Sequence, residues 1–338
     1  MSRTQNTPLL LALVVCIMVV AGVMIAAVFL AGQKPVVVVM PAAQPAPGVP
    51  AAGVVDAGPG STTPATAVQP PARPVEITVA RIAAVPALAN VYDAAWDKIP
   101  QVDVPLLPQQ TAAPMLDTAT IASVQVQAIR DDKRVAWRLS WAATQPAALS
   151  ETGHFADAVA IQIPLVDGAP FTMGAKGQPV RLLHWKALWQ KDIDFGFQDI
   201  AKLYPNSWSD LNWFAPHAGP VPTTQLVKDP KAVQFMPLHA AGNPMAIIDR
   251  KQPVEEIAAE GFGTATTVPN SASSARGVWK DGRWTVIIDR PLGPDDPISA
   301  RLQSAGQNMI SFAVWDGSAG NRGGRKHYCA WVPMKVEP

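Results

Sequence analysis

Cysteine is scarce in this chain of 338 residues, which contains only Cys16 and Cys329. Cys16 falls within a long apolar segment near the N-terminus, so Cys329 has no partner for a disulfide in the rest of the sequence. A Cys-x-x-Cys-His motif is also missing, and its absence excludes covalent attachment of a c-type haem.

Motifs of the common catalytic folds are missing as well. The sequence has no Gly-x-Ser-x-Gly elbow, no His-Glu-x-x-His pair, no phosphate-binding Gly-x-x-x-x-Gly-Lys loop and no dinucleotide fingerprint. Glu255 and Glu256 are adjacent, and in the short helix we expect there they would point about 100° apart, which argues against paired acid–base work. The net charge is only +1 with dispersed Lys and Arg, so nucleic acid is not an expected partner.

An uncharged apolar run covers residues 8–31. It is long enough for the roughly 20 helical residues that cross a bilayer, and longer than the ~7–15-residue core of a cleavable signal. We therefore predict a transmembrane anchor at 8–31 after a short cytoplasmic tail at 1–7, with an export signal as the alternative. This topology predicts a single-pass protein of the inner membrane whose globular part faces the periplasm.

Proline and alanine dominate residues 32–74, with glycine and threonine among them. This composition buries too little apolar surface to fold and favours extended conformations. We interpret 32–74 as a flexible linker and 75–338 as the folded domain.

Apolar residues alternate with period two through much of 75–338, which predicts an all-β protein. One such series is Val135, Trp137, Leu139 and Trp141, and others start at Val159, Trp284 and Ile310. Many short strands joined by turns favour a β-sandwich. Short helical inserts are expected around residues 198–203 and 255–260.

The order of short motifs between residues 92 and 333 resembles the haem b-binding γ subunits of ethylbenzene dehydrogenase, dimethylsulfide dehydrogenase and selenate, chlorate and nitrate reductases, including nitrite oxidoreductases. The segments that carry the resemblance are Tyr92–Lys98, His154–Ile163, Met173-Gly174, His184–Ala187, Gly242–Pro244, Pro253–Glu256, Glu260–Thr264, Asp281–Trp284 and Phe312–Gly317. The resemblance covers most of the folded domain and none of the first 75 residues.

This resemblance implies one haem b inside the sandwich, held by an axial methionine and an axial lysine. Met173 matches the thioether position. Lys251 is the first choice for the amine because it lies in a separate segment, and Lys186 is the alternative. His184 is a further candidate for contact with the cofactor, either as a ligand or at a propionate. Arg181, Arg250 and Arg276 are the arginines considered for the propionates.

The resemblance also implies an electron-transfer subunit that is not itself an enzyme. Its partners would be an iron–sulfur subunit and a molybdopterin catalytic subunit, with a soluble c-type cytochrome or the respiratory chain as the further redox partner. Trp208 and Trp213 interrupt the strand pattern and are candidates for the partner surface. The alternative function is a haem-free β-sandwich that serves as a binding or assembly module on a membrane stalk.

Overall fold

The computed structural model describes residues 75–206, 222–293, 295–303 and 307–338. The predicted anchor at 8–31, the predicted linker at 32–74 and both Trp208 and Trp213 lie outside these ranges. Within them, no helix has the length and apolar character needed to cross a membrane.

Strands are the main regular structure of the described chain, in agreement with the all-β prediction. Their bounds are β1 (Ile77–Arg81), β2 (Val102–Pro105), β3 (Leu107–Pro108), β4 (Ser123–Arg130), β5 (Arg134–Ala142), β6 (Ala158–Pro164), β7 (Val180–Lys186), β8 (Val254–Ala259), β9 (Thr266–Thr267), β10 (Ser274–Lys280), β11 (Arg283–Pro291), β12 (Gln307–Trp315), β13 (His327–Tyr328) and β14 (Val332–Val336). The helices are short, namely η1 (Ala94–Lys98), α2 (Ala187–Phe195), α3 (Ile200–Leu203), α4 (Thr223–Leu226), α5 (Pro230–Val233), α6 (Pro237–Ala240), η3 (Pro244–Ala246) and α7 (Pro297–Gln303).

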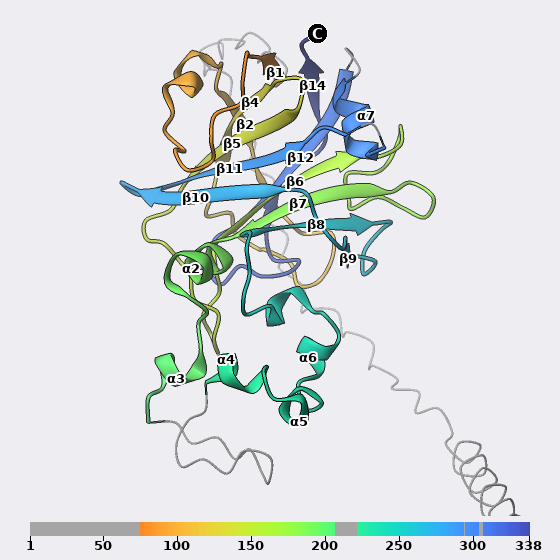
Figure 1. Ribbon diagram of the computed structural model, residues 1–338. Coiled ribbons are helices and arrows are strands. Elements are labelled where there is room, and N and C mark those ends of the chain that lie inside the picture. Colours follow the sequence, from red (N-terminus) through yellow and green to blue (C-terminus); the bar gives the residue numbers. More distant parts are fainter. Residues whose placement is uncertain (1–74, 207–221, 294, 304–306) are drawn as a thin grey trace, which may run out of the picture. The chain divides into compact units, whose positions relative to one another are not determined.

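Two groups of paired strands are joined through β12 (Figure 1). The first sheet has the order β10-β11-β5-β4-β1-β14-β12, with β2 paired to β4, and the second has the order β12-β6-β7-β8-β9, with β13 between β12 and β3. The first half of β12 pairs with β14, and the second half, from Ser311 to Trp315, pairs with β6. One strand therefore contributes to both sheets.

The main core lies between the two sheets and contains the alternating apolar residues recognised in the sequence. Val135, Trp137, Leu139 and Trp141 of β5 are all at most 1% exposed and share one cluster with the inward residues of β6, β7 and β12. Across the core, the Trp141 and Trp185 rings meet edge to face with centroids 6.2 Å apart, a favoured aromatic geometry.

The helix expected at 255–260 is not present, because this segment forms strand β8 and pairs along its length with β7. The two adjacent glutamates suggested a polar helix face, whereas in the strand they point to opposite faces and each has its own partners. Glu255 lies opposite His184, while Glu256 pairs with Arg181 at 3.1 Å. The helix expected at 198–203 is confirmed as α3.

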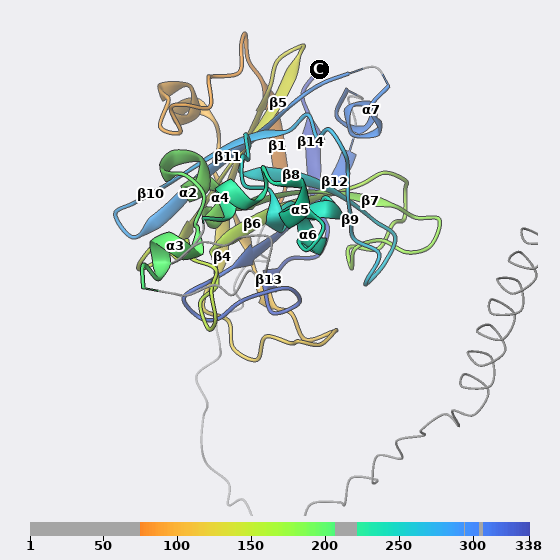
Figure 2. The ribbon, with the colours of Figure 1, turned by 60° about the horizontal axis from the view of Figure 1, so that its bottom comes forward.

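A long insertion between β7 and β8 contains α2 to α6 and η3. In Figure 1 these helices lie together below β8, and Figure 2 turns that end of the domain forward. Two contacts attach α2 to strand β10: the amide of Gly277 donates to Gln190 Oε1 at 2.9 Å, and Arg276 pairs with Asp194 at 2.5 Å.

Gly277 tests the packing between the sheets, because a Cβ there would lie 2.2 Å from the ring of Trp185. Since Trp185 is fully buried, the ring has no room to withdraw. We expect Gly277→Ala to lower the free energy of unfolding by about 1–3 kcal/mol through overpacking. Gly293→Ala is the matched control, since no atom lies within 4 Å of its Cβ position. Equal urea midpoints for the two variants would contradict this account.

Candidate functional site

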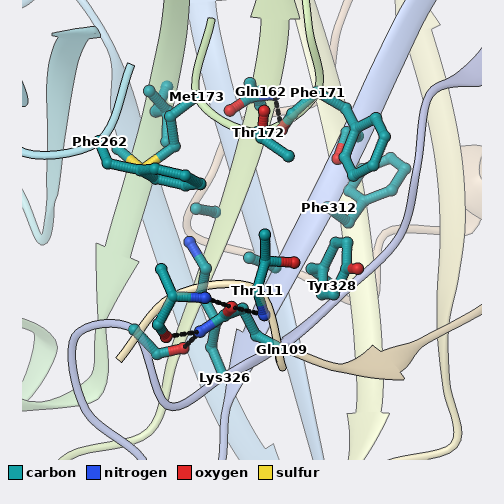
Figure 3. A pocket seen from close by; sticks show the side chains of 16 residues that line it. Gln109, Thr111, Gln162, Phe171, Thr172, Met173, Phe262, Phe312, Lys326 and Tyr328 are labelled. Carbon is teal, nitrogen blue, oxygen red and sulfur yellow. Dashed lines mark hydrogen bonds between the residues drawn. The ribbon is translucent and has the colours of Figure 1, made fainter. Parts of the chain in front are cut away.

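A mainly apolar cavity of about 90 Å³ lies on the outer face of the second sheet, the face turned away from the core. Its floor is formed by small or short side chains of β6 and β12, including Ala160 and Ala313, which face each other across the paired strands. Loops close it from the sides. Figure 3 shows Met173 and Phe262 at one side of the cavity and Lys326 at the other. The remaining lining residues are Gln109, Thr111, Ala112, Gln162, Phe171, Thr172, Leu182, Ser311, Phe312, Gly324 and Tyr328.

Met173 is held in an uncommon backbone conformation. Its φ is 69°, in the left-handed region that non-glycine residues seldom adopt, and Gly174 follows with a φ of 75°. A side chain at Gly174 would clash, because its Cβ would lie 2.5 Å from the carbonyl oxygen of Gln178. Gln162 supports the same loop by donating to the Phe171 carbonyl at 2.8 Å. Backbone strain of this kind persists where the surroundings fix it, and it is common at functional sites.

The two segments that carry much of the sequence resemblance meet at this loop. The amide of Gly261 donates to the carbonyl of Met173 at 2.8 Å. Thr264 closes the adjoining turn, because its hydroxyl donates to the Gly261 carbonyl and accepts from the Glu260 amide, both at 2.8 Å. Phe262, at the tip of this turn, is 58% exposed although it lines the cavity. The glycines thus allow a tight turn that presents an aromatic ring at the cavity mouth.

Lys326 lies on the segment that leads into β13, and two neighbours fix that segment. Gln109 accepts from the amides of Thr111 and Ala112 and donates to the carbonyl of Gly324 at 2.8 Å, which ties two loops together. His327 is fully buried, and its Nε2 accepts from the Thr120 amide at 2.9 Å. Met173 and Lys326 are therefore placed by separate, well-bonded segments.

The amine of Lys326 is in an unfavourable environment for a cation. Within the described ranges no carboxylate pairs with it, and its Nζ lies 5.2 Å from the centre of the Trp315 ring. Burial lowers the pKa of Lys326 to about 8, so that a much larger fraction of the amine is neutral than in an ordinary lysine. A lysine that is buried at a cost in free energy, with no carboxylate to offset its charge, is a candidate functional group.

The other predicted site residues lie elsewhere. Lys251 is exposed, just before β8, and does not line the cavity that contains Met173. Lys186 and His184 lie on β7 and line a second cavity instead. The structure therefore brings Met173 together with Lys326, which the sequence analysis did not single out. Lys326 belongs to no metal-ligand spacing, and its position beside the cavity depends on the pairing of β12 with β13.

The three arginines considered for propionates have other partners. Arg181 pairs with Glu256 and Arg276 pairs with Asp194. Arg250 donates to the carbonyl of Pro244 and lies over the ring of Trp189, 3.9 Å from its centre. None of the three lines the cavity with Met173.

Comparison with known families identifies the family to which the chain belongs. Residues 93–327 match the family described as ethylbenzene dehydrogenase. The chain belongs to this family. It is 26% identical over 247 residues to a protein of Haloferax mediterranei assigned as a respiratory nitrate reductase heme subunit, covering 72% of this chain and 67% of that one. It is also 26% identical over 246 residues to the chlorate reductase subunit gamma of Ideonella dechloratans, covering 70% and 75% respectively.

The chain is less similar in sequence to solved structures than to these two relatives. A family 9 carbohydrate-binding module from Caldicellulosiruptor kristjanssonii, in complex with glucose, aligns with 78% of this chain and 95% of the module. The identity is 7% and the TM-score is 0.34, so the likeness supports no conclusion about fold or ligand.

The donor set of the cavity fits a haem iron. A thioether and an amine of lowered pKa lie at its two sides, and its lining is mostly apolar. The volume of about 90 Å³ is smaller than the ~300–1,000 Å³ of typical ligand pockets, so a macrocycle would have to displace part of the lining. Phe262, on its exposed turn, is the side chain best placed to move outward.

The lowered pKa of Lys326 predicts a pH-dependent stability. Between pH about 8 and the ordinary lysine value of ~10.4, the unfolded chain binds a proton that the folded chain does not, so the free energy of unfolding rises with pH over this window. Without haem, Lys326→Met should be more stable than the wild type at pH 7, and the difference should shrink by pH ~10. Urea unfolding at both pH values measures this. Lys251→Met, at an exposed position, is the control, and a pH-independent gain in Lys326→Met would contradict the assignment.

Gly174 and Gly177 form a matched pair for testing the Met173 loop. Both have a φ of 75°, but the Cβ position of Gly174 lies 2.5 Å from a carbonyl oxygen, whereas that of Gly177 has no atom within 4 Å. Gly177→Ala should cost only the conformational penalty of about 1–2 kcal/mol. Gly174→Ala should cost a further 1–3 kcal/mol, roughly, from the clash. Denaturant unfolding measures both, and similar losses would show that the loop yields.

Proposed function

We propose that the chain is the haem-carrying electron-transfer subunit of a molybdenum oxidoreductase, with one haem b held between Met173 and Lys326. The observation that carries this proposal is the convergence of a thioether and an unpaired lysine, from segments far apart in the sequence, on one mainly apolar cavity. Among the described residues, Lys326 is the lysine that lines the cavity with Met173. The names of the two relatives, a heme subunit and a subunit gamma of reductases, support the same assignment.

Each proposed ligand has a distinct physical role. The thioether of Met173 is a soft ligand, which favours reduced iron and raises the potential. The amine of Lys326 must lose its proton before its lone pair can bind a metal, and the lowered pKa reduces the cost of that loss. The haem would supply one-electron transfer. The chain's own part is to position the two ligands and to limit access of water with the ring of Phe262 and the Phe171–Tyr328 stack.

The wider assembly is part of the same proposal. We infer that an iron–sulfur subunit and a molybdopterin catalytic subunit are the partners, and that a soluble c-type cytochrome or the respiratory chain exchanges electrons with the haem. Residues 8–31 would anchor the chain in the inner membrane, with residues 32–74 as a tether and the folded domain in the periplasm. The length and uncharged character of the 8–31 segment support the anchor.

The test is spectroscopy of the full chain, produced with export and a supply of haem. The wild type should show a stoichiometric low-spin b-type spectrum, with haem measured as the pyridine haemochrome. Met173→Ala should lower the reduction potential or lose the haem, and Lys326→Ala should yield a high-spin or haem-free protein.

Two lysines serve as controls in this test. Lys251→Ala and Lys176→Ala should leave the spectrum unchanged, since neither residue lines the cavity. A colourless wild type would reject the haem function. Loss of the low-spin signal in Lys251→Ala, with Lys326→Ala unaffected, would return the ligand to the position first chosen from the sequence.

A further inference from the structure

A second cavity, of about 250 Å³, lies beside the first on the same face of the second sheet. On β6 the first cavity is lined by Ala160 and the second by Ala158, and on β12 the corresponding residues are Ala313 and Trp315. These residues lie opposite each other in the strand register. A step of two residues along a strand covers roughly 6–7 Å, so the cavities are neighbours.

Positive charge gathers at this second cavity. Lys186 of β7 and Arg322 of the loop after β12 both line it, and no acidic residue does. Neither cation forms an ion pair with any carboxylate in the described ranges. Lys186 Nζ lies 3.4 Å from the sulfur of Met245, and burial lowers its pKa. Arg322 lies over the ring of Phe155 and donates to the carbonyl of Gly320. Both cations thus remain available to an anion.

Two buried nitrogen atoms at the same cavity have no hydrogen-bond partner in the described structure. Asn321 is 1% exposed; its Oδ1 accepts from the amide of Asp316, but its Nδ2 donates to nothing. His184 lies against Glu255, with Nδ1 3.4 Å from the carboxylate, and its Nε2 is unpartnered. A buried polar atom without a hydrogen bond costs about 1–3 kcal/mol of folding free energy, so a bound ligand that supplies the missing partner would be stabilised there. The donor of Asn321 calls for an acceptor oxygen.

The opposite end of the first cavity does not offer the same chemistry. A third hollow there is lined by Phe171, Asn308 and Trp331, and its cation, Arg301, already pairs with Asp167 at 2.5 Å. The anion-binding character is therefore on the Ala158 side.

We propose that this second cavity is a carboxylate-binding subsite, in which Lys186, Arg322 and Asn321 receive the propionates of a haem held in the first cavity. This inference rests on the proposed function, because it names the cofactor's carboxylates as the source of the anion. The carboxylate class fits because two unpaired cations and one amide donor surround a space next to an apolar cavity that suits a macrocycle. His184 lies on the same side, but burial lowers its pKa to about 4, so its neutral ring adds no positive charge to the subsite.

The experiment compares two probes on the full chain: haem, and haem dimethyl ester, in which the same macrocycle and iron carry no free carboxylate. The wild type should bind haem about 100-fold more tightly than the ester. In Lys186→Met/Arg322→Gln the affinity for haem should fall by about 100-fold, near tenfold for each charge-assisted contact, while the affinity for the ester stays within about threefold. The spectrum should remain low-spin, since Met173 and Lys326 are untouched.

Lys133→Met/Arg81→Gln is the matched control, because it removes the same charge from exposed positions near the turn between β4 and β5. It should leave both affinities unchanged. Urea unfolding of the two double variants checks that any loss is not a folding defect.

The remaining outcomes separate the two proposals. Equal losses for haem and ester in Lys186→Met/Arg322→Gln would overturn the subsite and leave the haem function intact. No binding of either probe by the wild type would overturn both. If succinate binds by calorimetry and needs Lys186 and Arg322, but haem and its ester bind alike, the cavity takes free carboxylates and the propionate assignment is overturned.

Discussion

The side-chain alternation on β6 and β12 is the constraint on which the cavity depends. Successive residues of a strand face opposite sides, so Val159, Ile161 and Ile163 fill the core between the sheets while Ala158 and Ala160 face outward. The same division on β12 sends Val314 inward and Ala313 outward. Large residues inside hold the sheets together, and small residues outside leave space beneath the loops. A slip of one residue in this register would exchange the two faces and remove the cavity.

The loops above this face place charge where solvent is scarce, and the placement is specific. Lys326 sits in a segment fixed through Gln109 and through His327, and Met173 is fixed through Gln162 and the glycine turn at Gly261. These bonds to the Met173 and Lys326 segments come from outside the described part of the long insertion between β7 and β8. An uncompensated lysine in an apolar setting reduces stability, and it persists in a folded protein when the neutral amine has a use. Coordination of a metal is such a use.

Sequence patterns were sufficient for the sheets and insufficient for part of the site. Period-two alternation identified β5, β6, β11 and β12, because a half-buried strand imposes that pattern directly. It failed at 255–260, where both faces of β8 carry a buried glutamate and each glutamate is satisfied by a partner on another element. Motif order pointed to Met173, whose left-handed backbone also requires the glycine that follows it. Lys326 could not be chosen in the same way, because only the long-range pairing of β12 and β13 brings it to the cavity.

The two cavities differ in the number of cations that line them. The first is mainly apolar and has one cation without a counter-ion, and the second has two more, Lys186 and Arg322. Trp315 contacts residues of both cavities. The Nζ of Lys326 lies 5.2 Å from the centre of the Trp315 ring, and the centre of the His184 ring lies 5.0 Å from it. Lys186 and Lys326 are half-buried and Arg322 is exposed, and negative charge added among the three would reduce their mutual repulsion. A cofactor that places two carboxylates beside Lys186 and Arg322, and a metal that takes up the neutral amine of Lys326, would relieve both costs together.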